Sequence, residues 1–270
     1  MKKHILDLEL RSTERLNDSH ALLRLTDPQG PLPAMRPGQF VEVRVDGSTQ
    51  TFLRRPISIN RVVRPANELW LLVHAVGEGT RRLAAMEPGE ALNVVLPLGN
   101  GFTLPEAVAQ GAEPQSCLLV GGGVGTAPLL ALGEELAARG HQPVFVLGAR
   151  AAKDLMQLDI FSQMGPVHIT TEDASAGERG FVTQHSIWTK HSSMAPVRRV
   201  YTCGPKPMMV AVARRCRELG LRCEASLENM MACGLGACLC CVEDTVDGHL
   251  CVCKDGPVFD VERLKWGIGD

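Results

Sequence analysis

The stretch from Met231 to Phe259 reads MACGLGACLCCVEDTVDGHLCVCKDGPVF and contains six of the chain's ten cysteines. Three of them, Cys233, Cys238 and Cys241, are separated by four and then by two residues. Plant-type two-iron, two-sulfur clusters use this spacing and add a fourth thiolate from further along the chain. Thiolate is a soft ligand that binds iron well. The stretch therefore predicts a [2Fe-2S] site.

The fourth ligand has to be chosen between Cys251 and Cys253. We favour Cys253 because it runs directly into Lys254-Asp255-Gly256-Pro257, a turn that can present a ligand from a separate segment. Cys251 and Cys240 would then be spare.

Two glycines between the first two cysteines fit a loop that wraps a cluster. Gly234 and Gly236 allow unusual dihedral angles and bring backbone N–H groups close to sulfur. Four cysteines also suit structural zinc, but zinc ribbons favour paired two-residue spacings rather than a leading gap of four. A disulfide framework is typical of small secreted domains, and nothing in this sequence indicates secretion.

Composition excludes several classes of partner. The 270 residues include 28 basic and 30 acidic side chains, a formal charge of -2, so no basic excess favours nucleic acid or an anionic membrane surface. The amino terminus lacks the apolar region of a signal peptide, and no apolar run is long enough to span a bilayer. We expect a cytoplasmic protein, because free thiols and an iron–sulfur site suit that reducing compartment.

The first third of the chain has short, alternating, β-branched stretches separated by Pro- and Gly-containing turns. This pattern predicts a six-stranded antiparallel barrel, interrupted by one helix that begins near Thr80. The expected strands lie within residues 5–10, 20–25, 39–45, 51–59, 68–76 and 91–98.

Two barrel motifs could carry chemistry. In Arg55-Pro56-Ile57-Ser58, the proline suits an edge or ligand-facing position, the arginine offers a forked cation for phosphate, and the serine offers a hydroxyl for a heteroaromatic ring. Gly77-Glu78-Gly79-Thr80 opens a helix whose N–H groups and dipole could receive a pyrophosphate. Alone, each also fits an ordinary surface strand or helix cap.

The middle third begins with a nucleotide-binding pattern. A buried strand at 117–120 leads into Gly121-Gly122-Gly123-Val124-Gly125 and a helix from Thr126 through Arg139. Glycines let the backbone approach a phosphate, and the helix start supplies N–H groups. The strict fingerprint is absent because Thr126 and Pro128 stand where a third glycine is expected, so a helix simply packed tightly on a sheet is the alternative.

Alternating strands and helices then predict an open, doubly wound sheet of five parallel strands. After the first strand, strands are expected near 144–148, 167–171, 199–202 and 222–225, and helices near 153–164, 183–190 and 207–219.

Ligands of such sheets bind at the carboxyl ends of the strands, where Cys203-Gly204-Pro205 also emerges. Cys203 could touch a nicotinamide or be a small buried apolar residue. Arg150 could meet a 2′-phosphate, which leaves NAD or NADP open, whereas Glu172 and Asp173 are expected to be loop charges.

The order of barrel, nucleotide-binding region and carboxyl-terminal cluster segment resembles the ferredoxin reductase superfamily. Within it, the chain most resembles the electron transfer subunits of class 1B dihydroorotate dehydrogenase. The motifs that carry this resemblance span nearly the whole chain: LRRPISI (53–59), VGEGT (76–80), VGGGVGTAPLL (120–130), TEDASAGERGFVT (171–183), YTCGPKPMM (201–209), SLENMMACGLGAC (226–238) and CKDGPVF (253–259).

This resemblance implies a division of labour between two subunits. A separate FMN-containing subunit would oxidise dihydroorotate in pyrimidine (UMP) biosynthesis, and electrons would pass through a [2Fe-2S] cluster and FAD in this chain to NAD+. The family implies a heterotetramer with two copies of each subunit. It also implies an FAD-binding domain at 1–103, an NAD-binding domain at 104–225 and a cluster-binding domain at 226–270.

Several site residues follow from the same resemblance. His74 stands where the family often has arginine. The implied cluster ligands are Cys233, Cys238, Cys241 and Cys253, and the implied FAD contacts are Arg55, Pro56, Ile57, Ser58, Leu72, Val73, His74, Gly79 and Thr80.

Two other functions remain open from the sequence. One is a reductase subunit of the same superfamily that serves ferredoxin, a hydrogenase or glutamate synthase. The other is a non-enzymatic module stabilised by zinc. No general acid–base pair and no Ser-His-Asp arrangement is singled out, so we expect no catalytic residue here and place the base for dihydroorotate oxidation in the partner.

Overall fold

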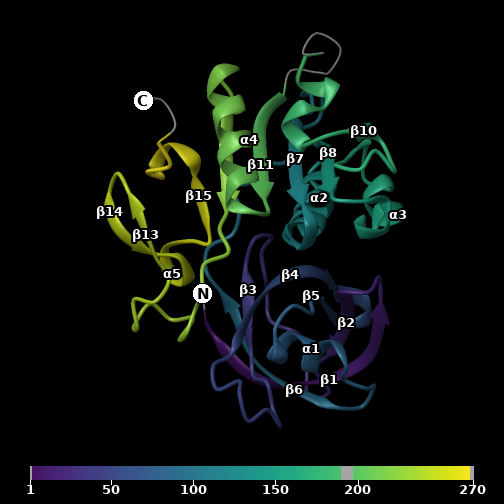
Figure 1. Cartoon of the computed structure of the whole chain (residues 1–270), viewed down its shortest axis with the longest axis vertical. Helices are drawn as coiled ribbons and strands as arrows, with labels where there is room; N and C mark the ends of the chain where they lie inside the picture. Colours follow the sequence, from purple (N-terminus) through teal and green to yellow (C-terminus); the bar gives the residue numbers. More distant parts are fainter. Residues whose placement is uncertain (1, 190–196, 268–270) are drawn as a thin grey trace.

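The computed structural model describes residues 2–189 and 197–267. Its first third is a closed antiparallel barrel with the strand order β1-β2-β5-β4-β3-β6, which confirms the expected six strands (Figure 1). Side chains alternate across each wall, so that Val41 and Val43 point into the barrel core. The strands are β1 (His4–Arg15), β2 (His20–Thr26), β3 (Phe40–Val43), β4 (Arg55–Val63), β5 (Glu68–His74) and β6 (Ala91–Leu98), and helix α1 (Glu78–Ala84) follows β5.

The middle third forms a sheet in the order β10-β9-β8-β7-β11-β12-β15. The five expected parallel strands are present, and the structure adds two edge strands that the sequence pattern did not indicate. One, β10, is very short, and the other, β15, runs antiparallel to β12. The strands are β7 (Ser116–Gly122), β8 (Gln142–Ala149), β9 (Val167–Thr171), β10 (Glu178–Arg179), β11 (Val197–Cys203), β12 (Arg222–Ser226) and β15 (Val258–Asp260), with helices α2 (Ala127–Ala138) and α4 (Lys206–Glu218).

Two expected helices are shorter than the sequence predicted. Between 153 and 164, Gln157 adopts a left-handed conformation with φ of 55°, so only α3 (Leu158–Ser162) forms after a short 3₁₀ turn. Between 183 and 190, His185 is extended and separates two 3₁₀ turns, at Val182–Gln184 and Ser186–Trp188. Lys190, the last residue of that expected helix, lies outside the described residues.

Helix α2 starts one residue later than predicted. Gly123–Thr126 forms a 3₁₀ turn, and the α-helix begins at Ala127. No helix within the described ranges is long and apolar enough to cross a membrane.

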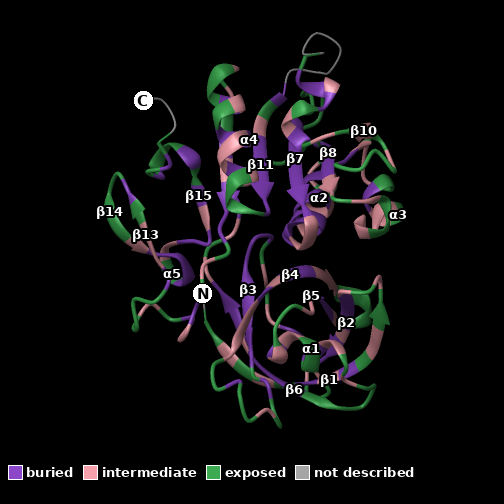
Figure 2. Cartoon of the chain, viewed as in Figure 1, coloured by how far each residue is buried: buried purple, intermediate pink, exposed green. Residues whose placement is uncertain are grey.

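The carboxyl-terminal segment packs against both other regions. It forms a hairpin of β13 (Val242–Thr245) and β14 (Gly248–Cys251), then the short helix α5 (Val252–Asp255), and returns as β15 to the edge of the sheet. The first half of α5, Val252 and Cys253, is buried where this segment meets the barrel (Figure 2). One apolar cluster joins Phe40 and Leu98 of the barrel, Val120 of the sheet, and Val252 and Phe259 of the segment.

A buried polar contact joins the barrel to helix α2. Asn60 Nδ2 donates to the Ala127 carbonyl and to Gln157 Oε1, both at 3.1 Å, and Gln157 Nε2 donates back to Asn60 Oδ1 at 3.0 Å. An ion pair of 2.6 Å between Arg61 and Glu134 lies beside it. These contacts fix the barrel against the nucleotide-binding region.

Candidate cluster-binding and nucleotide-binding sites

The first two predicted cluster ligands form a pair. The loop between Cys233 and Cys238 turns back on itself, with Gly234 and Gly236 both at positive φ. The Leu235 N–H donates to Cys233 Sγ at 3.3 Å. Burial acts to raise the pKa of Cys233, but hydrogen bonds from the N–H groups of this loop and from the Cys238 thiol outweigh it and lower the pKa to about 6. The loop thus stabilises a thiolate at Cys233.

The other two predicted ligands form a second pair on buried segments. The Cys253 N–H donates to Cys241 Sγ at 3.3 Å, and the Gly236 N–H donates to Cys253 Sγ at 3.1 Å. The second contact ties the glycine loop to helix α5, although the two are far apart in sequence. The structure therefore brings Cys253 to Cys241 and to the loop that carries Cys233 and Cys238.

The remaining two cysteines of the segment lie apart from these pairs. Cys240 is exposed, and its thiol points to the Met230 carbonyl at 3.7 Å. Cys251 is held in the hairpin opposite Val242. Across the described residues, no three His, Cys, Asp or Glu side chains converge on one point as a single metal ion would require. Two thiol pairs with N–H groups aimed at sulfur suit a two-iron cluster better than one four-thiolate zinc site.

A cavity of about 740 Å³ opens at the carboxyl ends of the parallel strands. Ligands of doubly wound sheets bind at this edge. The predicted residues that line it are Gly122, Gly123, Gly125, Gly204, Pro205 and His74. Gly121, Thr126 and Cys203 were predicted as well, but they lie behind the cavity wall and are buried.

The two predicted nucleotide motifs touch through glycines. A Cβ atom on Gly125 would lie 2.4 Å from Gly204 Cα, so a side chain there would push the two turns apart. A Cβ on Gly122 would lie 2.6 Å from Met208 Sδ at the start of α4. The glycines therefore let the two turns pack closely around the cavity, and they also let a ligand approach the backbone there.

Arg150, which could meet a 2′-phosphate, lines this cavity, but sequence reasoning missed acidic groups there. Glu172 lines it, although it was expected to be a loop charge. Glu228 also lines it and accepts a 3.8 Å hydrogen bond from the Cys203 thiol. Surrounding protein atoms raise the pKa of Glu228, even though part of the side chain is open to the cavity. A signal for Glu228 was its place in the SLEN motif directly after the last parallel strand.

The two predicted barrel motifs lie side by side. A Cβ on Gly79 would come within 3.2 Å of Arg55 Nε, so the helix start and the arginine share one surface. The Thr80 hydroxyl caps helix α1 by accepting from the Gly77 N–H at 3.1 Å. Arg55 and Ser58 are partly exposed on β4, as a cofactor-facing position requires.

Three predicted FAD contacts have side chains that point away from any open surface. Ile57 and Val73 belong to the barrel core, and Leu72 packs on Ala127 and Met156. Any contact that these residues make with a cofactor therefore runs through the backbone.

His74 is stacked on a residue that the sequence did not single out. The rings of His74 and His20 lie 4.3 Å apart with an interplanar angle of 7°, and both line the cavity. His20 Nδ1 lies 3.0 Å from Asn17 Oδ1 and 3.1 Å from Ser19 Oγ. Burial, helped by His74, lowers the pKa of His20 to about 4, and burial also lowers the pKa of His74.

Family models match two parts of the chain. Residues 119–214 match the oxidoreductase NAD-binding domain, and residues 228–265 match the iron-sulfur cluster binding domain of dihydroorotate dehydrogenase B. The second match covers all four predicted cluster cysteines.

A solved structure shares the whole arrangement. A chain from the NADH-dependent reduced ferredoxin-NADP oxidoreductase, studied for flavin-based electron bifurcation, is 28% identical with a TM-score of 0.83. The match covers 97% of this chain and 90% of that one. The Amycolatopsis cytochrome P450 reductase, at 24% identity and a TM-score of 0.67, shows the same fold over 80% of this chain and 66% of its own.

Curated relatives resemble the chain over most of its length. The electron transfer subunit of dihydroorotate dehydrogenase B (NAD(+)) from Shouchella clausii is 41% identical over 261 residues, which cover 94% of this chain and 95% of that protein. The subunit of the same name from Listeria monocytogenes is 40% identical over 234 residues, covering 86% and 88%. This chain therefore belongs to the family of dihydroorotate dehydrogenase B electron transfer subunits.

Proposed function

We propose that this chain is the electron transfer subunit of an NAD-linked dihydroorotate dehydrogenase of pyrimidine biosynthesis. It carries electrons from a catalytic partner subunit to NAD+ and uses a [2Fe-2S] cluster and FAD to do so. The observation that carries the proposal is the pairing of Cys233 with Cys238 and of Cys241 with Cys253, in a chain whose relatives bear that name.

The cluster site requires four thiolates and a backbone that neutralises part of their charge. Cys233, Cys238, Cys241 and Cys253 would hold the cluster, and the N–H groups of Leu235 and Gly236 would stabilise its sulfur ligands. When bound, the cluster would supply one-electron transfer, which a nicotinamide, as a hydride acceptor, cannot perform.

The flavin and dinucleotide sites would lie on either side of the contact between barrel and sheet. Arg55 would pair with a phosphate through its forked guanidinium, and Gly79 with Thr80 would present helix N–H groups. Ser58 and His74 would face the flavin. The dinucleotide would bind in the cavity against the glycine turn and Gly204-Pro205, where Glu228, with the buried Cys203 thiol behind it, offers a group that can hold a proton.

The partner supplies what this chain lacks. We propose an FMN-containing subunit that provides the base for dihydroorotate oxidation, in a heterotetramer of two catalytic and two electron transfer subunits in the cytoplasm. The three cofactor sites would divide the chain into FAD-binding (1–103), NAD-binding (104–225) and cluster-binding (226–270) regions.

The first test is the composition and activity of protein purified without air. We expect flavin with about two irons and two sulfides per chain, NADH-dependent reduction of a dye, and no oxidation of dihydroorotate until the partner is added. Protein that contains zinc and no flavin would contradict the proposal, as would substantial dihydroorotate turnover by the isolated chain.

A reductase for another acceptor is the second candidate, because the 28% identical chain comes from a ferredoxin-linked enzyme. Efficient reduction of ferredoxin by NADH, without any coupling to a dihydroorotate-oxidising partner, would favour it.

A further inference from the structure

One wall of the barrel lies directly under the cluster loop. On β3, Val41 and Val43 point into the barrel, so Phe40 and Glu42 share the outer face. Phe40 packs in the apolar cluster that includes Cys241 and Cys253. This face of β3 is therefore covered by the cluster segment rather than by solvent.

Glu42 touches the loop between the first two cluster ligands. A Cβ atom on Gly234 would lie 2.7 Å from Glu42 Cγ and 3.1 Å from Glu42 Oε1. Gly234 is at φ +63, next to Cys233. In the barrel sheet, Glu42 pairs with Pro56 of the predicted flavin motif. The side chain thus stands between two proposed redox sites.

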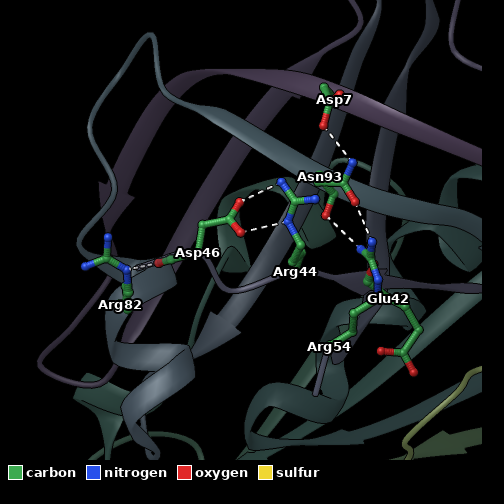
Figure 3. A network of polar contacts seen from close by, with 7 residues as sticks. All are labelled: Asp7, Glu42, Arg44, Asp46, Arg54, Arg82 and Asn93. Atoms are coloured by element: carbon green, nitrogen blue, oxygen red, sulfur yellow. Dashed lines mark hydrogen bonds and ion pairs between the residues drawn. The ribbon is translucent and has the colours of Figure 1, made fainter. Parts of the chain in front are cut away.

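The carboxyl group of Glu42 is buried without a hydrogen-bond partner among the described residues. Glu42 as a whole is 1% exposed, and neither of its carboxyl oxygens has a hydrogen-bond partner among the described residues. Arg54, a neighbouring cation, directs its guanidinium hydrogen bonds to the Glu42 carbonyl and to Asn93 instead. Figure 3 shows the Glu42 carboxyl pointing away from that network. A polar group is costly in such a place, so its retention needs a reason.

We propose that Glu42 is a positioning residue for electron transfer, whose buried carboxylate lies under the cluster loop and lowers the reduction potential of the cluster. The inference rests on the proposed function. A buried charge is poorly screened, and a cluster gains negative charge when it is reduced, so an adjacent anion disfavours reduction. A lower potential makes the reduced cluster a stronger electron donor to the flavin.

The test is a redox titration of the loaded protein, followed by electron paramagnetic resonance, in wild type and Glu42→Gln. Burial, opposed by Arg54, raises the pKa of Glu42. The comparison is therefore made at about pH 9, well above the usual range of a carboxyl, because only the ionised form carries the charge. Glu42→Gln keeps the shape and removes the charge. We expect its midpoint potential to rise by about 59 mV, a tenfold change in the one-electron equilibrium.

Two further variants keep the result interpretable. Glu42→Met is neutral and buries no unpaired polar group, so it should show the same rise even if the glutamine variant fails to load the cluster. Asp46→Asn removes a charge from an exposed carboxylate of the same barrel, which Arg44 already holds at 2.7 Å, and should leave the potential unchanged.

An unchanged potential in the loaded Glu42 variants would overturn the proposal, and so would an equal rise in Asp46→Asn. Failure of the proposed function looks different. A zinc-stabilised module would contain no iron and sulfide to titrate, and a reductase for another acceptor would keep the cluster but show no coupling to a dihydroorotate-oxidising partner.

Discussion

At the scale of single residues, the choice of the fourth cluster ligand is the sharpest consequence of the structure. Cys253 Sγ accepts a hydrogen bond from the Gly236 N–H, and the Cys253 N–H donates to Cys241 Sγ. Cys251, in contrast, is held in the hairpin. We expect Cys253→Ser to lose most of the iron and the visible spectrum of the cluster, and Cys251→Ser to keep both. Iron and sulfide analysis measures this. Equal loss in both variants would show that the pairing seen here does not select the ligand.

The buried His20 makes stability depend on pH. Its pKa falls from 6.5 in an unfolded chain to about 4 in the folded one, so between these values the unfolded chain binds more protons. Stability should therefore fall as pH decreases through this window, by about 2 kcal/mol between pH 7.5 and pH 5 from this group. Urea unfolding at both values should show a smaller difference for His20→Asn. Equal pH dependence in wild type and variant would contradict this account.

Residues differ in how far the sequence could predict their roles. Cysteine spacing can predict cluster ligands because ligand chemistry acts over a short, local segment. Glu42 and Glu228 could not be found that way, because each acquires its environment from segments distant in sequence: Gly234 covers Glu42, and Cys203 contacts Glu228. The sequence immediately around Glu42 and Glu228 does not indicate those contacts.

At the scale of elements, the packing of two turns governs the nucleotide site. Gly125 lies against Gly204, and an added methyl group would come within 2.4 Å of its backbone. We expect Gly125→Ala to weaken NADH binding about tenfold or more, because the turns after β7 and β11 would separate. Gly30→Ala is the control, since nothing lies within 4 Å of a Cβ there. Fluorescence titration with NADH measures the change, and wild-type affinity in Gly125→Ala would refute the packing argument.

Periodicity predicted the strands and the longer helices but not their interruptions. The helix expected at 153–164 is broken at Gln157, whose amide pairs with Asn60 of the barrel. The left-handed Gln157 is therefore held by a tertiary hydrogen bond. Local helix propensity cannot predict it, because the partner Asn60 lies far away in the sequence. The edge strand β15 was missed for a similar reason, because its partner β12 lies more than thirty residues earlier in the chain.

At the scale of the whole molecule, the cluster-binding region contributes to the fold as well as to redox chemistry. Its strand β15 completes the sheet, and the Asn100 N–H of the barrel donates to the Gly256 carbonyl at 2.6 Å. The boundary at 225/226 stays a prediction, and packing crosses it: the apolar cluster around Phe40, Leu98 and Phe259 spans both sides, and Glu228 lines the nucleotide cavity.

A chain that ends at Ser226 should therefore be less stable than the full chain even without any cluster. Removing the segment would expose Phe40 and Leu98, which are 3% and 1% exposed in the full chain, and would leave β12 as an open edge. The matched control is full-length protein stripped of iron, because neither sample then holds a cluster and the difference reports packing alone. We expect a lower thermal midpoint and stronger binding of an apolar dye by the shortened chain. Equal midpoints would mean that the barrel and sheet fold without this segment, and that its contacts with them serve only to hold the cluster near the flavin.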